Sequence, residues 1–532
     1  MQIVRIGQGS RELASAEVIG SKAANLARMA AMGLPVPPAF VLPIELCAAC
    51  LSGDAAAKRF LADGLREGIQ FLEMATGRTL GSRRRPLLVS VRSGAARSMP
   101  GMLDTVLDVG CTPAAVRGLV RMTGQPHFAW DCRRRFLESY ACVVLGMKRD
   151  DFAESLAEVM SAEGVADEAA LDGAALESLA LAYQRLIEDE DVNLPEDPVD
   201  QLVTAAEAVF RSWTSERATT YRRLQHLEDL QGTAVTIQTM VFGNSGLTSG
   251  AGVAFTRDPS TGAKTPIIDV LFDSQGEDVV SGSRTPDTEA AIARRTPAAA
   301  KELREILARL EREFGDVQDV EFTIENGKLW ILQTRAAKRT PLAALRFAID
   351  FVKEGLVSPA QALQQLGDLD LGALARKRLV DPPAPAARGT GASAGVATGR
   401  AAFDSVSAQR MAADGGPVIL VRPDTSTADI AGFAAAAGIV TAVGGRTAHA
   451  ALVARQMGKP SVVGCASLSM DAAHRGVRIN GTAIKEGDWL SIDGEAGAVY
   501  LGRYDCVTDR PEAELAELAR WRADTAMLNR AS

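Results

Sequence analysis

The chain lacks three features that would each assign it to a particular class of protein. It has no apolar run long enough to span a bilayer, because the Ala/Gly-rich run from Ala431 to Gly445 is too short and too mixed. No apolar segment follows Met1, so no signal peptide is expected. Its seven cysteines are odd in number and scattered, which favours free thiols over a disulfide framework. We therefore predict a cytoplasmic protein with no membrane partner.

An excess of positive charge is also missing. The chain has 58 Lys and Arg against 66 Asp and Glu, a net charge of −8, which argues against nucleic acid as a partner. It can still bind a nucleotide where cations gather locally. Hydrophobic content of 47% and charged content of 23% are typical of a soluble globular protein. A length of 532 residues implies roughly two to four domains.

The periodicity of apolar residues divides the chain into four regions. Residues 1–340 mix strands and helices, and residues 341–388 read as helices followed by a proline-rich linker from Asp381. Residues 389–502 alternate strand and helix, and residues 503–532 form a charged tail with one helix at 511–525. In the third region we expect strands at 417–422, 438–443 and 461–464, and a helix at 426–436 that Ser426 and Asp429 cap. The fold class is therefore multi-domain α/β.

His449 follows the glycine pair Gly444-Gly445 and stands at the start of a further predicted helix. Apolar residues recur behind it at helical spacing, and Gly458 suits the C-terminal stop. A helix N-terminus carries partial positive charge and free backbone N–H groups, so an imidazole there tends to stay neutral and an attached phosphoryl group would be stabilised. A histidine at such a position is more often a cap or a surface residue, and the position alone does not decide between the two readings.

Two glycine-containing stretches nearer the N-terminus could approach phosphates. Residues 87–106 read as a buried strand that leads into a loop, with Arg92 at the strand end and Arg97 in the loop. Residues 242–262 could form a lid over phosphates or a hairpin, and the residues by themselves favour the hairpin.

The segment GGRTAHAALVARQMGKPSVVGC at 444–465 closely resembles the phosphohistidine segment of the pyruvate phosphate dikinase and phosphoenolpyruvate synthase family. Segments SVRSGAARSMPGMLDTVLDVG at 90–110 and QDVEFTIENGKLWILQTRAAKRT at 318–340 are similar to its nucleotide-binding segments. The resemblance covers nearly the whole chain. It implies an ATP-grasp domain over residues 1–340 and a swivelling phosphohistidine domain over residues 389–502.

The resemblance also implies roles for particular residues. His449 would carry the phosphoryl group, Arg335 would clamp it, and Asp319 would support that site. The phosphates of ATP would be held by Lys22, Arg92 and Arg135. Glu321 and Gln333 would bind Mg²⁺, and a monovalent cation is a further candidate cofactor. Asp269 stands where many relatives have a longer acid, so it is left out of the site. Thr447 is interpreted as a helix cap.

The metal assignment depends on the hairpin between residues 320 and 335. A two-residue Asn326-Gly327 loop would place Glu321 and Gln333 on opposite faces. A three-residue loop over 325–327 would place both on one face together with Asp319 and Arg335. The metal assignment requires the three-residue loop and fails with the two-residue one, whereas an amphipathic hairpin with one solvated face would accept either.

Full-length members of the family continue into a barrel that binds pyruvate or phosphoenolpyruvate, and these 532 residues leave no room for it. The leading hypothesis is the nucleotide half-reaction of a dikinase. ATP, with phosphate or water as second acceptor, would phosphorylate His449 and leave AMP, and a separate barrel protein would hold the final acceptor. The alternatives are a phosphotransferase for another small molecule and a non-catalytic phosphocarrier or regulatory protein.

Overall fold

A computed structural model describes residues 2–7, 13–97, 99, 102–190, 192–282, 284–367, 369, 374, 376–424, 429–470 and 476–531. They form two compact units. The first contains residues 1–246 with 330–334, and the second contains residues 247–329 and 335–532. No helix among the described residues is both long and apolar enough to cross a membrane. All seven cysteines are free, as the sequence predicted.

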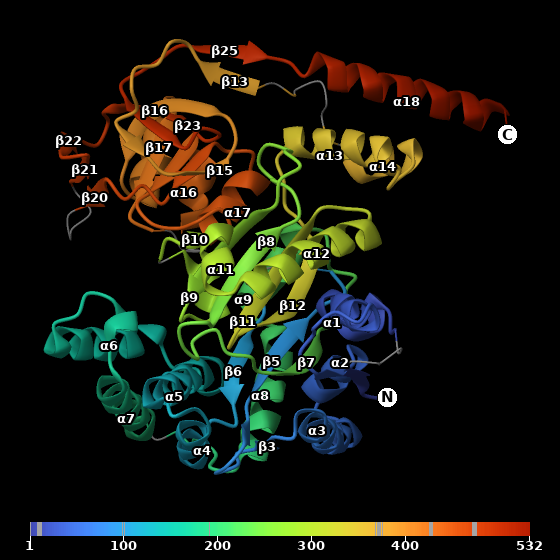
Figure 1. Ribbon diagram of the computed structural model, residues 1–532, viewed down its shortest axis with the longest axis vertical. Coiled ribbons are helices and arrows are strands. Elements are labelled where there is room, and N and C mark those ends of the chain that lie inside the picture. The colour runs from blue at the N-terminus through green and yellow to red at the C-terminus, as the bar shows by residue number, and fades with distance from the viewer. Residues whose placement is uncertain are drawn as a thin grey trace. The chain divides into compact units, whose positions relative to one another are not determined.

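The first unit is built on an antiparallel sheet, whose strands β2 and β7 are buried along their whole length (Figure 1). In spatial order its described strands are β1 (Val4–Ile6), β2 (Ala39–Leu42), β7 (Ala234–Thr239), β5 (Val89–Gly94) and β6 (Thr105–Val109). The helices of this unit are α1 (Ala16–Ala31), α2 (Glu45–Leu51), α3 (Ala55–Thr76), α4 (Pro113–Thr123), α5 (Pro126–Tyr140), α6 (Arg149–Glu163), α7 (Gly173–Asp189), α8 (Pro198–Ser212) and α9 (Glu216–Leu224). One hydrophobic core joins strands β2, β5, β6 and β7 to the helices α2 to α9.

Gly20 brings helix α1 against the end of strand β5. It has φ of 80°, which interrupts the helical path. A Cβ atom at this position would lie 2.1 Å from the carbonyl oxygen of Gly94. The N–H of Ser21 then donates to the carbonyl of Ala95 over 2.9 Å. The glycine thereby sets Lys22 beside the strand that carries Arg92.

Another sheet begins the second unit, and its described strands are, in spatial order, β10 (Asp287–Thr288), β9 (Ile267–Phe272), β8 (Gly250–Phe255), β11 (Gln318–Glu325) and β12 (Lys328–Ala336). Only the two ends of β12 belong to this unit, because residues 330–334 are part of the first. The helices that accompany it are α10 (Gly276–Ser281), α11 (Glu289–Arg295) and α12 (Pro297–Phe314). β8 and β9 pair antiparallel, so part of the 242–262 stretch is a hairpin, as expected. Arg257 in its loop is buried and forms ion pairs of 2.8 Å with both Glu311 and Glu354. Its side chain therefore has a structural role.

The turn between β11 and β12 differs from the expectation. Asn326 and Gly327 have φ of 50° and 80°, and they alone separate the two strands. The three-residue loop is therefore wrong, because Asn-Gly readily adopts the two positive φ values of a tight hairpin turn.

The pairing changes farther along these strands. The N–H of Ala337 donates to the carbonyl of Val317 over 2.9 Å. Counted from the turn, this pair needs one more residue on β12 than on β11, which is a β-bulge. Beyond the bulge, each side chain of β12 points to the opposite face of the sheet from the one that the turn by itself would give. Asp319 and Arg335 therefore share a face. Asp319 and Arg335 thus lie on one face, as expected, but the bulge places them there and the turn does not.

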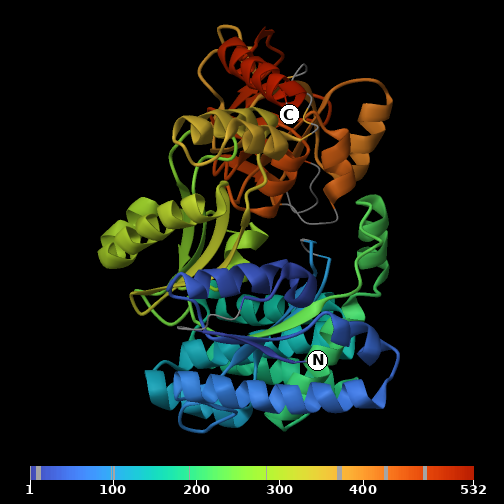
Figure 2. The same cartoon turned by 90° about the vertical axis from the view of Figure 1, so that its right-hand side faces the viewer.

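Residues 341–388 are helical only in their first part, which contains α13 (Pro341–Lys353) and α14 (Pro359–Leu366). The tail helix α18 (Glu512–Ala531) packs on both through Leu518 and Trp521, as Figure 2 shows for the yellow and red helices. Before the proline-rich linker, β13 (Arg376–Leu379) pairs with β25 (Cys506–Asp509). A strand thus precedes the tail helix, which the sequence reading missed.

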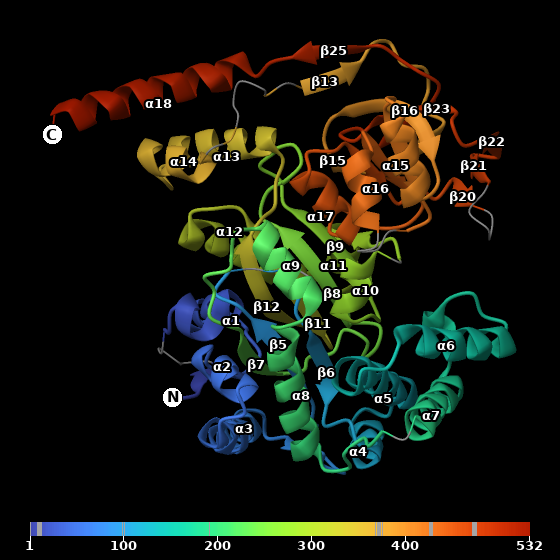
Figure 3. The ribbon, with the colours of Figure 1, turned by 180° about the vertical axis from the view of Figure 1, so that it is seen from behind.

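Residues 387–501, called the 387–501 domain below, form an α/β layer. Its described strands are, in spatial order, β14 (Ala387–Arg388), β24 (Ala498–Leu501), β23 (Trp489–Asp493), β16 (Val396–Ala402), β17 (Val418–Arg422), β18 (Gly438–Thr441), β19 (Ser461–Val463) and β15 (Thr390–Ser393). One face packs on α15 (Ser405–Ala413), α16 (Ile430–Ala435) and α17 (His449–Gln456), which lie together in Figure 3. The other face packs on β20 (Leu468–Met470), β21 (Val477–Ile479) and β22 (Thr482–Ile484).

The three strands predicted in this domain are confirmed within one or two residues, as is the helix that begins at His449. The helix expected at 426–436 is described only from Ile430 to Ala435. Ser426 and its proposed cap lie outside the described residues.

Candidate functional site

Lys22, Arg92 and Gln333 line one small cavity in the first unit. Its other walls are Ala23, Leu26, Ser93, Thr236, Gln238 and Leu332. The guanidinium Nη2 of Arg92 lies 3.5 Å from the amide oxygen of Gln333. Two cations in one polar recess suit an anionic group such as a phosphate. The structure thus brings together three side chains that stand far apart in the sequence.

Arg135 lies on α5 and is held by a neighbour on the same helix. Its Nε contacts both carboxylate oxygens of Asp131, at 3.0 and 3.2 Å. Asp131 also accepts from Asn244 at 2.6 Å and pairs with Arg134 at 2.8 Å. Sequence reasoning named Arg135 and missed Asp131 and Asn244. The spacing of Asp131 four residues before Arg135 on one helix was the available signal.

Asp319 and Arg335 form a mostly buried ion pair on neighbouring strands. Arg335 Nε lies 2.8 Å from Asp319 Oδ2, and the side chain of Asp319 is only 2% exposed. The other carboxylate oxygen, Oδ1, is buried without a hydrogen-bond partner. Burial raises the pKa of Asp319 and Arg335 opposes that shift, while Glu321, two residues along the same face, adds to it. The pair fixes the direction of the Arg335 guanidinium.

The residues expected to bind Mg²⁺ suit a hard cation by their chemistry, although the two-residue turn removes the register argument that placed Glu321 and Gln333 on one face. Glu321 offers carboxylate oxygens, and Gln333 offers an amide oxygen. No group of three or more His, Cys, Asp and Glu side chains with metal-site spacing occurs in the described part of the chain. Mg²⁺ does not require one, because it is commonly held by one or two carboxylates with substrate phosphates and water completing its shell. The buried, unpartnered oxygen of Asp319 adds a further acceptor beside Glu321.

Helix α17 begins at His449, with Ala448 as its N-cap residue. Gly444 has φ of 108°, and a Cβ atom on Gly445 would lie 2.4 Å from Pro286. Gly444 therefore supplies a backbone angle that other residues rarely adopt, and Gly445 lets the backbone pass close to Pro286. The imidazole of His449 lies outside the described part of the structure, so its chemical role stays a prediction. Its backbone position at a helix N-terminus is confirmed.

Thr447 does not cap α17, contrary to the sequence interpretation. Its N–H and its hydroxyl both donate to Asp269 Oδ2, each over 3.0 Å. Asp269 lies on β9 and is buried, which raises the pKa of its carboxyl group against the opposing effect of these hydrogen bonds. Asp269 was left out of the candidate site because it is shorter than the acid that many relatives have there, and its bond to Thr447 was not foreseen. It joins β9 to the loop before His449.

Two family models match the chain. Residues 54–299 and 288–348 match the model described as "Pyruvate phosphate dikinase, AMP/ATP-binding domain". Residues 415–497 match the model described as "PEP-utilising enzyme, mobile domain". The first model covers the strands that carry Arg92, Glu321 and Arg335, and the second covers the glycine pair and His449. The predicted fold class, an ATP-grasp-type domain followed by a phosphohistidine-type domain, is confirmed.

Similar curated proteins carry one name. A chloroplastic pyruvate, phosphate dikinase of Flaveria trinervia is 42% identical over 93% of this chain and 52% of its own length. Pyruvate, phosphate dikinase 2 of Zea mays is 41% identical over 96% of this chain and 58% of its own. The enzyme of Rhizobium meliloti is 40% identical over 97% and 59%. The chain thus spans little more than half the length of the curated relatives it matches. With these matches and with the residues described above, this chain belongs to the pyruvate phosphate dikinase family.

Proposed function

We propose that this chain catalyses the nucleotide half-reaction of a dikinase, in which ATP phosphorylates His449 and AMP is released. The observation that carries the proposal is that one chain matches both the AMP/ATP-binding model and the mobile-domain model of the family. The position of His449 at the first residue of α17 supports it, because a helix N-terminus favours an attached phosphoryl group.

The cationic residues account for binding and charge neutralisation. Lys22 and Arg92, which share one cavity, would hold the phosphates of ATP together with Arg135. Arg335, oriented by Asp319, would clamp the phosphoryl group during transfer. Phosphoryl transfer needs little covalent help from the protein, so positioning and charge neutralisation supply most of the rate.

Glu321 and Gln333 would hold Mg²⁺, and Asp319 would contribute charge beside them. When bound, the ion would neutralise phosphate oxygens and keep the nucleotide in one orientation.

In the transfer step, a neutral nitrogen of His449 forms a bond to the β-phosphorus of ATP. The bond from that phosphorus to the oxygen of AMP breaks, and AMP leaves with the electron pair. The γ-phosphoryl passes to inorganic phosphate or to water. Neutral imidazole is required for the attack, and the positive end of α17 disfavours its protonation.

The acceptor of the second half-reaction is proposed to be pyruvate bound by a separate protein. The names of the relatives support pyruvate as the acceptor. Adding pyruvate to the phosphorylated chain alone should give no phosphoenolpyruvate, and adding a family barrel domain should restore it.

The first half-reaction is tested with the chain alone, ATP, Mg²⁺ and phosphate. We expect AMP and an acid-labile, base-stable protein phosphate, both abolished in His449→Ala because the nucleophile is lost. Label from β-³²P ATP should map to His449 by mass spectrometry.

His226→Asn serves as the control, since His226 is an exposed histidine whose positive φ asparagine tolerates. It should form AMP and phosphoprotein at the unchanged rate. Formation of ADP without AMP would refute the dikinase assignment.

A further inference from the structure

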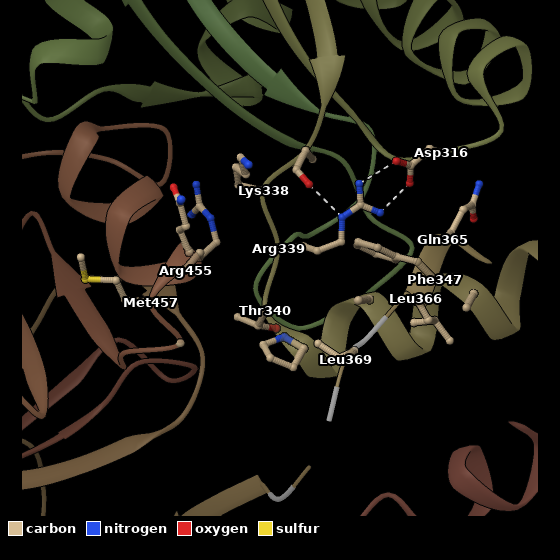
Figure 4. A pocket seen from close by; sticks show the side chains of 16 residues that line it. Asp316, Lys338, Arg339, Thr340, Phe347, Gln365, Leu366, Leu369, Arg455 and Met457 are labelled. Atoms are coloured by element: carbon tan, nitrogen blue, oxygen red, sulfur yellow. Dashed lines mark hydrogen bonds and ion pairs between the residues drawn. The ribbon is translucent and has the colours of Figure 1, made fainter. Parts of the chain in front are cut away.

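A cavity of about 560 Å³ lies in the second unit (Figure 4). Its walls come from Asp316 before β11, the segment between β12 and α13, the helices α13 and α14 with Leu369 beyond them, and the C-terminal end of α17. None of Lys22, Arg92, Glu321, Gln333 or Arg335 lines it. A cavity of this size can hold a metabolite-sized molecule.

Four ionisable side chains line the cavity, and two of them neutralise each other. Arg339 pairs with both oxygens of Asp316, at 2.5 and 2.8 Å, and donates its Nε to the carbonyl of Ala337. The dashed lines in Figure 4 mark these contacts. The other two ionisable side chains are those of Lys338 and Arg455.

Lys338 and Arg455 have no acidic partner within ion-pair distance among the described residues. Lys338 is exposed at the edge of the cavity. Arg455 is 1% exposed. Its Nη1 donates to the carbonyls of Ala392 and Arg446, whereas Nε and Nη2 are buried without a hydrogen-bond partner, and the guanidinium carbon lies 5.1 Å from the centre of the Phe255 ring.

A buried cation such as Arg455 without a close counter-charge is costly, and an anion nearby would recover part of that cost. Burial lowers the pKa of Arg455 to about 10, even though the more distant Asp319, Asp258 and Asp269 favour its charge. The acids of this unit thus leave its charge incompletely balanced.

The remaining walls of the cavity are largely apolar. They come from Ala337, Pro341, Ala344, Phe347, Ala348, Leu366, Leu369 and Met457. In the view of Figure 4, Lys338 and Arg455 lie on one side and Phe347 and Leu366 on the other. A ligand that suits both sides has an anionic group and an apolar body.

We propose that this cavity is a second binding site, which takes a small organic anion with its negative group on the exposed ammonium of Lys338, on the side of the buried charge of Arg455, and its apolar body on Phe347 and Leu366. Such a ligand would touch the end of α17, the helix that begins at His449. It would also touch the segment 337–340 between β12 and α13. It would thereby tie the 387–501 domain to the rest of its unit.

The test uses 8-anilinonaphthalene-1-sulfonate, an aromatic sulfonate, titrated into the whole chain and followed by its fluorescence. We expect saturable binding at one site, unaffected by saturating ATP and Mg²⁺. Lys338→Glu should weaken it about tenfold, because one charge-assisted contact is replaced by repulsion. Ala344→Trp fills the cavity from a half-buried helical position and should abolish it.

Lys301→Glu is the matched control, since Lys301 is a surface lysine of α12 with an 82% exposed side chain. It should bind the probe as the unchanged chain does. The proposal would be overturned if ATP displaced the probe or if no saturable binding were seen. It would also be overturned if Lys338→Glu and Ala344→Trp each bound the probe with the affinity of the unchanged chain. Lys338→Arg, which keeps the charge, should bind normally and excludes a folding defect as the cause of weaker binding.

Discussion

At the scale of single residues, buried aspartates direct the arginines that the family resemblance names. Asp319 holds Arg335, and Asp131 holds Arg135. A guanidinium bonded to a fixed carboxylate keeps one orientation, which preorganises it for a phosphate. The arginines were identified from motifs, but the residues that orient them became visible only as partners.

Asp319→Asn is expected to slow AMP formation by about two orders of magnitude, since Arg335 loses the charge that fixes its direction. Single-turnover quench experiments with ATP and Mg²⁺ measure the rate. Asp316→Asn is the control, because it breaks a comparable pair, with Arg339, outside the ATP residues. Equal rates in the two variants would show that Asp319 has no special part in the reaction.

At the scale of an element, α5 carries Asp131 and its two arginines within one turn. Burial by itself would raise the pKa of Asp131, but Arg135, Arg134 and the hydrogen bond from Asn244 lower it far below the ordinary 3.8. A carboxyl group with a depressed folded-state pKa stabilises the fold above its unfolded pKa. That contribution is lost as the pH falls below about 4 toward the folded value.

Asp131→Asn should therefore destabilise the chain by about 3 kcal/mol at pH 7, since two arginines lose a buried partner. The difference in stability between Asp131→Asn and the unchanged chain should become smaller as the pH drops below 4. Urea unfolding midpoints at pH 7, 5, 4 and 3 provide the measurement. Asp150→Asn, at an exposed position of α6, should leave the midpoint unchanged, and a pH-independent gap for Asp131→Asn would contradict the assignment.

At the scale of the molecule, one buried carboxylate connects two regions that the sequence reading treated as separate domains. Asp269 on β9 accepts both the N–H and the hydroxyl of Thr447, just before α17. A group that fixes the entry to a helix also restrains the opening of its first turn.

Asp269→Ala should make amides in the first turn of α17 exchange about tenfold faster, because the acceptor that holds Thr447 is removed. Hydrogen exchange followed by mass spectrometry on peptides covering 444–456 measures this. Asp287→Ala, at an exposed position on the adjacent strand β10, provides the control. Unchanged exchange in Asp269→Ala would mean that the contact contributes nothing to holding the loop.

Local patterns in the sequence predicted the strands of the 387–501 domain and the start of α17 well. Apolar spacing and glycine positions act over a few residues, so one sequence contains enough to read them. The hairpin between β11 and β12 shows where such reading fails. Asn326-Gly327 indicated a tight turn, whereas the bulge that brings Asp319 opposite Arg335 has no local signature.

By itself the sequence determined the α/β layers, the family and the helix that begins at His449, because each follows from short-range spacing or from long ungapped motifs. Only the tertiary structure decided that Thr447 bonds to Asp269 and that Arg455 is buried without an acidic partner. Burial and ion pairing depend on which distant segments meet, and the free energy of a charge is set by those neighbours.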